Sequence, residues 1–160
     1  MTGLLRRAVE LWALAGGIVL LGVALMTSWS AASGWVFSRP LPGDVELTEM
    51  LVAVAAFAFL PYCQLTRANV SADIFTARAG PRTVALLALL SALIALGFSL
   101  LLTWRMYEGL LDYRKYVETT TILRIPIWYA YLPALASLVL LALACLASVR
   151  EAVRDWAGRR

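Results

Sequence analysis

The fold of this chain is decided by residues 83–104, TVALLALLSALIALGFSLLLTW, a stretch of 22 residues without a charged side chain. Three more charge-free stretches, of 28, 17 and 25 residues, cover residues 11–38, 50–66 and 125–149. An α-helix rises about 1.5 Å per residue, so roughly 20 apolar residues cross a hydrocarbon core of about 30 Å. The four stretches therefore predict an all-α integral membrane protein with four transmembrane helices.

The chain has room for one compact helical unit and little else. It has 160 residues, of which 62% are hydrophobic. The segments between the charge-free stretches are too short to bury a core of their own, because chains below roughly 40 residues rarely fold unaided. We therefore expect a single four-helix membrane domain over residues 1–160. Its predicted spans cover about residues 11–37, 45–66, 82–105 and 125–149.

Composition also argues against several classes of function. There is no histidine, which removes bis-imidazole haem ligation and the usual general base. The two cysteines, Cys63 and Cys145, lie inside apolar stretches, where a free thiol behaves as a small hydrophobe. The 14 basic residues lie mostly beside the spans and not in a dense run with interleaved aromatics, as nucleic-acid binding would require. We expect no metal, no cofactor, no nucleic-acid partner and no enzymatic activity.

The first break between helices is marked by residues 38–43, SRPLPG, whose two prolines and glycine forbid helical continuation. Asp44 is the expected N-cap of the second helix, with Glu46 and Glu49 in its opening turns, where the helix dipole favours negative charge. Pro61 removes one backbone hydrogen bond from this helix and predicts a kink.

Glu49 is the strongest candidate for a functional ionisable residue, because it lies more than one helical turn beyond Asp44. Placing a charge inside a span costs at least a few kcal/mol and therefore suggests a function. Three interpretations stay open for Glu49: a solvated helix start, a pairing site for a basic group, and a carboxylate that couples transport to protons.

The third helix is expected to run on past the membrane as an amphipathic interfacial helix. Its apolar face holds Met106, Tyr107, Leu110, Tyr113 and Val117, and its charged face holds Arg105, Glu108, Asp112 and Lys115. Arg114 and Glu118 break this pattern four residues apart. Pairing with each other, contact with a partner and solvation by lipid headgroups all stay open for them. Pro126 is expected to open the last helix.

Charge also predicts the orientation, since the cytoplasmic ends of spans carry more Lys and Arg. With both termini on one side of the membrane, that side holds nine basic residues and the other side five. The five are Arg39, Arg105, Arg114, Lys115 and Arg124. The positive-inside rule thus favours cytoplasmic N- and C-termini.

Three parts of the sequence together resemble a known family. They are residues 39–49, RPLPGDVELTE; residues 60–64, LPYCQ, with residues 69–73, NVSAD; and residues 121–128, TILRIPIW, followed by Tyr131 and Pro133. In order and spacing they resemble the small membrane subunit, of DctQ type, of tripartite ATP-independent periplasmic (TRAP) transporters. The resemblance covers nearly the whole chain, including its length and four spans.

The resemblance implies a division of labour in the bacterial inner membrane. A periplasmic solute-binding protein delivers an organic acid or similar solute, a large multi-span membrane subunit carries the substrate and coupling-ion sites, and the small subunit braces that scaffold in contact with membrane lipid. The residues expected to bind these protein partners are Arg39, Glu46, Glu49, Arg114, Glu118 and Arg124. The expected structural motif residues are Pro42, Gly43, Pro61, Tyr62, Asp73, Pro126 and Trp128.

Two other functions compete with this one. A self-sufficient small proton-coupled exporter would use Glu49 as its carboxylate, but such proteins usually place the acid deep in the first helix, and this chain has none between Glu10 and Arg39. A membrane anchor subunit of another complex, such as a redox enzyme, is disfavoured by the lack of histidine.

Overall fold

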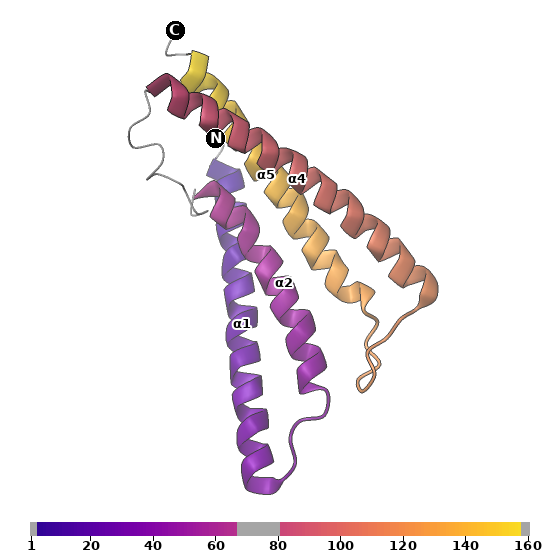
Figure 1. Ribbon diagram of the computed structural model, residues 1–160. Helices are drawn as coiled ribbons and strands as arrows, with labels where there is room; N and C mark the ends of the chain where they lie inside the picture. Colours follow the sequence, from indigo (N-terminus) through magenta and orange to yellow (C-terminus); the bar gives the residue numbers. More distant parts are fainter. Residues whose placement is uncertain (1–2, 67–80, 158–160) are drawn as a thin grey trace.

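The computed structural model describes residues 3–66 and 81–157, which form four α-helices (Figure 1). They are α1 (Gly3–Phe37), α2 (Asp44–Leu65), α4 (Pro81–Tyr116) and α5 (Trp128–Ala157). Each is long and apolar enough to cross a bilayer, and the described residues contain no β-strand. The prediction of an all-α protein with four membrane-spanning helices is confirmed.

The helices form two hairpins that pack side by side. α1 packs against α2, α4 packs against α5, and contacts between α2 and α5 join the hairpins. α1 and α4 therefore lie on the two flanks (Figure 1). The start of α1 and the end of α5 lie at one end of the bundle, here called the terminal end (Figure 1). The connections 38–43 and 117–127 lie at the other end, here called the loop end.

Small residues allow the helices to approach closely. A Cβ added at Gly16 of α1 would lie 2.9 Å from the Cβ of Ala58 and 3.4 Å from the carbonyl oxygen of Ala55, both in α2. Most of the buried apolar side chains are alanines. Helices in lipid gain little from the hydrophobic effect between them, so their association depends on such close contact. The large apolar side chains mostly point outward, as lipid-facing residues do.

A few polar and aromatic contacts join helices that are distant in sequence. The indole Nε1 of Trp12 in α1 donates a hydrogen bond to the buried Ser137 Oγ in α5 at 2.8 Å. Ser137 Oγ in turn donates to the carbonyl oxygen of Pro133 at 2.8 Å. Between α4 and α5 the rings of Tyr113 and Tyr131 lie 5.1 Å apart. Every buried polar side-chain atom among the described residues has a hydrogen-bond partner.

The structure differs from the sequence-based expectations at three helix ends. Gly43, and not Asp44, is the N-cap of α2. α4 ends at Tyr116, before Glu118, because Val117 has a φ of +49°. α5 begins at Trp128, so Pro126 precedes the helix, because Pro126 forms an isolated β-bridge with Thr119.

Two further features of the helices bear on the expectations. α4 runs without a break through residues 105–116, and the placement of this segment at the membrane interface stays a prediction. α2 runs as one helix through the buried Pro61 to Leu65.

Candidate functional site

The loop end brings the carboxylate of Glu46 against the connection between α4 and α5. Its Oε1 accepts a hydrogen bond from the backbone N–H of Ile122 at 2.7 Å, and its Oε2 accepts one from the N–H of Leu123 at 3.0 Å. Consecutive backbone amides of this kind form a concavity that favours an anion. Glu46 lies in the first turn of α2, so this contact ties the first hairpin to the second.

Gly43 makes room for the same connection. Its φ is +79°, a left-handed conformation that residues with a Cβ adopt at a cost. A Cβ added there would lie 2.7 Å from Leu123 Cδ1 and closer still to its Cγ. The carbonyl oxygen of Gly43 also accepts the first backbone hydrogen bond of α2, from Leu47 N at 3.0 Å. Glycine is therefore required at position 43 both for the turn and for the packing of Leu123.

The buried Ser30 of α1 forms hydrogen bonds to the turn between α1 and α2. Its hydroxyl donates to Asp44 Oδ2 and accepts from the backbone N–H of Leu41, the latter at 3.1 Å. The other carboxylate oxygen of Asp44, Oδ1, accepts from Val45 N at 2.8 Å. Asp44 thus still satisfies a free amide at the helix start, although it is the first helical residue and not the cap.

The connection 117–127 has a defined backbone. Thr120 N donates to the carbonyl oxygen of Ile125 at 2.9 Å, and Ile127 N donates to that of Glu118 at 3.1 Å. Thr120 Oγ1 accepts a further hydrogen bond from Ile125 N at 3.1 Å. Arg124 has a φ of +54° at the tip of this turn. These bonds present the amides of residues 122 and 123 to Glu46 and leave the Arg124 side chain exposed.

A family model for the DctQ component of tripartite ATP-independent periplasmic transporters matches residues 23–155. The chain belongs to this family. It is thus a multi-pass membrane protein of the TRAP transporter small-subunit type, and the resemblance seen in the sequence is confirmed. A comparison with curated proteins gives no match.

Of the residues expected to bind partners in this DctQ chain, three are exposed charges near the loop end. Arg39, Glu49 and Arg124 are all exposed, and within residues 3–66 and 81–157 none of them forms an ion pair with another side chain. Their freedom leaves them available to a second protein.

The other three expected residues have contacts within the DctQ chain. Glu46 holds the two amides described above. The guanidinium of Arg114 lies 5.9 Å from the ring centre of Trp128, a cation–π contact, although the Arg114 side chain is exposed. The backbone carbonyl of Glu118 accepts from Ile127. Arg114 and Glu118 do not lie one turn apart on a helix, as their spacing suggested, because α4 ends between them.

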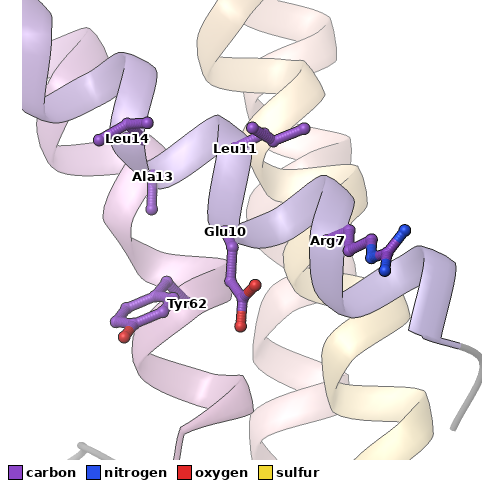
Figure 2. Close-up of a pocket in the computed structure, with 6 residues that line it drawn as sticks. All are labelled: Arg7, Glu10, Leu11, Ala13, Leu14 and Tyr62. Carbon is purple, nitrogen blue, oxygen red and sulfur yellow. The ribbon is translucent and has the colours of Figure 1, made fainter.

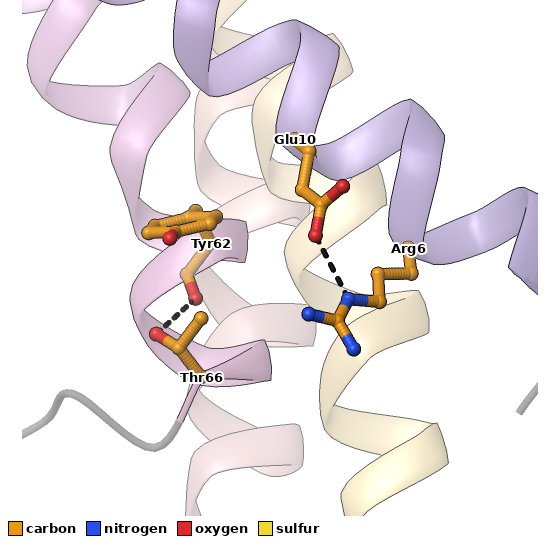
Figure 3. Close-up of polar contacts among 4 residues, drawn as sticks. All are labelled: Arg6, Glu10, Tyr62 and Thr66. Atoms are coloured by element: carbon orange, nitrogen blue, oxygen red, sulfur yellow. Dashed lines mark hydrogen bonds and ion pairs between the residues drawn. The ribbon is translucent and has the colours of Figure 1, made fainter.

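Of the other motif residues of the DctQ chain, Pro61 and Tyr62 lie in α2 away from this site. Tyr62 lies at the terminal end, where it lines an open cavity with residues of α1 (Figure 2). Its backbone carbonyl accepts from Thr66 Oγ1 at 2.8 Å, and its ring lies near the ion pair of Arg6 with Glu10 (Figure 3). Asp73 lies outside the described residues. Among the described residues no cluster of His, Cys, Asp and Glu side chains could hold a metal ion.

Sequence reasoning missed the partners of Glu46 and the role of Ser30. The Glu46 partners are backbone amides, which any residue type supplies, so no side-chain pattern indicates them. Ser30 lies inside an apolar stretch of the first helix, where nothing in the sequence indicates a contact with Asp44. The turn itself was visible in the sequence as Pro42-Gly43-Asp44. Ser30, whose hydroxyl supports the turn, lies 14 positions before Asp44.

Proposed function

We propose that this chain braces the large TRAP membrane subunit, holding its fixed scaffold in the bacterial inner membrane during ion-coupled uptake of an organic acid or similar solute. A periplasmic solute-binding protein delivers the solute to the assembly. The family assignment supports a small permease subunit with these partners. The chain's own contribution in this proposal is mechanical, and it carries no solute itself.

The observation that carries the proposal is the contact of Glu46 with the amides of Ile122 and Leu123. A brace must resist relative movement of its own parts. The packing of α2 against α5 already joins the two hairpins, and a contact at the loop end would resist their separation there. This contact joins the hairpins at the loop end, and the Trp12–Ser137 hydrogen bond joins α1 to α5 nearer the terminal end. With both in place the four helices move as one body.

The flanking helices α1 and α4 supply the surfaces that contact lipid or another membrane protein. α1 and α4 carry many exposed large apolar side chains along their length. In a membrane such faces are covered either by lipid or by another membrane protein. We propose that one is covered by the large subunit and that lipid covers most of the rest. With cytoplasmic termini the loop end faces the periplasm, where the binding protein arrives.

The exposed charges at the loop end are the proposed points of contact with protein partners. Glu49 is one turn beyond Glu46 and is exposed, so it suits a basic group of the large subunit. Arg39 and Arg124 suit acidic groups of the large subunit or of the binding protein. Glu46 acts on the partner indirectly in this proposal, by fixing the turn that carries Arg124. Arg114 and Glu118 flank the same turn.

Co-purification tests the proposal. The chain is expressed together with a large TRAP membrane subunit from the same genome, and the large subunit recovered with the chain is quantified. Exposed ion pairs contribute about 0–1 kcal/mol each, so Glu49→Lys, which reverses one charge, is expected to lower recovery by up to about fivefold through loss of the pair. The matched control is Asp112→Lys, the same charge change at an exposed residue of α4, which should leave recovery unchanged.

Uptake in proteoliposomes tests the mechanical role. The chain alone should move no solute, and the chain with the large subunit and the binding protein should. Transport by the chain alone would overturn the proposal. Undiminished recovery and full uptake with Glu49→Lys would remove Glu49 from the proposed interface.

A further inference from the structure

The terminal end has an open cavity of about 490 Å³ between α1 and α2 (Figure 2). It is lined by Arg7, Glu10, Leu11, Ala13, Leu14 and Tyr62. The volume lies within the range of about 300–1,000 Å³ found for sites that bind small molecules. Nothing in the bracing function of the loop end uses this cavity.

Two residues of opposite charge, both in α1, line the cavity. Arg7 and Glu10 are three residues apart, and Figure 2 shows Glu10 between Arg7 and Tyr62. The ion pair of Glu10 with Arg6 joins Oε1 to the Arg6 Nε at 2.8 Å (Figure 3), so Oε2 is left for another donor. Arg7 is exposed and forms no ion pair with a side chain in the described parts of the chain.

An apolar track leads from these charges towards the loop end. Leu11, Leu14, Ile18, Leu21 and Leu25 follow one another along one face of α1 at helical spacing, and each is 61–66% exposed. A charged recess followed by a long apolar track matches the chemistry of a lipid, with a polar headgroup and an acyl chain. A free phosphate or another small soluble anion would use the recess and leave the track uncovered.

We propose that this cavity binds a phospholipid whose headgroup carries both a phosphate and a primary ammonium, that is, a phosphoethanolamine lipid. The Arg7 guanidinium, with its fork of N–H donors, binds the phosphate. Glu10 Oε2 accepts a hydrogen bond from the ammonium. One acyl chain lies along Leu11, Leu14 and Ile18, and the Tyr62 ring borders the headgroup, as tyrosine does at membrane interfaces.

Glu10 sets the selectivity in this proposal. Arg6 offsets the charge of this carboxylate, so the selectivity comes from the hydrogen bond that an ammonium donates to Oε2 and that a phosphoglycerol headgroup cannot supply from a charged group. A choline headgroup has no N–H to donate, so it forms only the weaker Coulombic contact. The proposal does not depend on the contacts proposed for the loop end, but it requires that lipid, and not the large subunit, cover this face of α1.

Native mass spectrometry of the full chain, purified from membranes with its large subunit, tests the inference. After delipidation, phosphatidylethanolamine or phosphatidylglycerol is titrated back, and binding to the small subunit is counted. Arg7→Gln is expected to weaken phosphatidylethanolamine binding about tenfold, as loss of a charged hydrogen bond does. Arg154→Gln, which changes an exposed arginine at the same end of the bundle, should not. Glu10→Gln should shift the preference towards phosphatidylglycerol.

Three results would overturn the inference. The first is equal phosphatidylethanolamine binding by Arg7→Gln and Arg154→Gln. The second is a wild-type chain that binds phosphatidylglycerol as well as phosphatidylethanolamine. The third is efficient cross-linking of a Leu14→Cys chain to the large subunit, which would show that a helix of that protein, and not lipid, covers the track.

Discussion

Glu46 and Ile122 are 76 residues apart in the chain and are joined by a hydrogen bond of 2.7 Å from the Ile122 amide to the Glu46 carboxylate. The bond crosses from one helical hairpin to the other at the loop end. A carboxylate that receives two backbone amides makes charge-assisted hydrogen bonds, which are stronger than neutral ones. This contact is therefore the best place to test whether the hairpins act as a unit.

Glu46→Ala should free the amides of Ile122 and Leu123 without unfolding the bundle. Hydrogen exchange at these two amides is expected to become clearly faster, while exchange within α2 stays slow. The measurement is hydrogen–deuterium exchange with mass spectrometry on detergent-solubilised chain. Glu49→Ala, an exposed carboxylate on the same helix, is the matched control. Equal exchange in all three proteins would contradict the role given to Glu46.

Gly43→Ala should destabilise the chain by about 2 kcal/mol or more, because it combines a left-handed backbone with a Cβ that meets Leu123. The readout is thermal unfolding in detergent. Leu123→Ala in the same chain should recover part of the loss, since it removes the steric contact but not the backbone cost. Gly34→Ala is the control, because a Cβ there would make only ordinary contact with Pro40. If Gly43→Ala leaves thermal unfolding unchanged, the turn accommodates the new Cβ without strain, and glycine is not required at this position.

Gly16→Val should weaken the contact of α1 with α2. The new side chain would push against Ala58 and the backbone of Ala55, at a cost of about 1–3 kcal/mol for an overpacked core. Gly22→Val changes another glycine of α1, where nothing lies within 4 Å of an added Cβ, and should cost much less. Thermal unfolding measures the loss of stability in each variant. Equal losses for Gly16→Val and Gly22→Val would contradict the close approach at Gly16.

Trp12→Phe should remove the hydrogen bond that joins α1 to α5. Hydrogen bonds between membrane helices contribute about 0.6 kcal/mol on average and up to about 1.7 kcal/mol. A double-mutant cycle with Ser137→Ala should give a coupling in that range. Trp29→Phe, at a tryptophan that is 66% exposed, should have little effect. Additive losses for Trp12→Phe and Ser137→Ala would indicate that the two side chains do not interact.

The helices could be predicted from the sequence because lipid imposes one simple requirement, a long run without charge. The charge-free run at residues 83–104, for example, lies wholly within α4 and begins two residues after its start. The ends were harder to predict. Pro126 was expected to open the last helix, and it lies before that helix because it forms a β-bridge with Thr119, while Ile125 and Ile127 bond to Thr120 and Glu118. Helix ends depend on such contacts with distant residues, which hydropathy does not report.

The candidate site was predicted in part. Pro42-Gly43 and Glu46 were singled out, and all lie at the loop end, where the hairpins meet. The resemblance to the DctQ family implied that Glu46 contacts a partner, and this stays a prediction. In the structure the backbone amides of Ile122 and Leu123 donate to its carboxylate, and a contact of this kind depends on the path of the backbone and not on residue type. Arg39, Glu49 and Arg124 are exposed, and their contact with partners stays a prediction.

The most direct test of a rigid brace is the distance between the two hairpins at the loop end during transport. Spin labels at Phe37→Cys and Tyr116→Cys, both exposed positions in the wild-type chain, report it by pulsed electron paramagnetic resonance in a chain with Cys63→Ser and Cys145→Ala. If the chain is a rigid brace, the labels will give one distance distribution. This distribution will stay unchanged when solute, binding protein and an ion gradient are supplied to the reconstituted complex. A second distance that appears only under transport conditions would contradict a rigid brace.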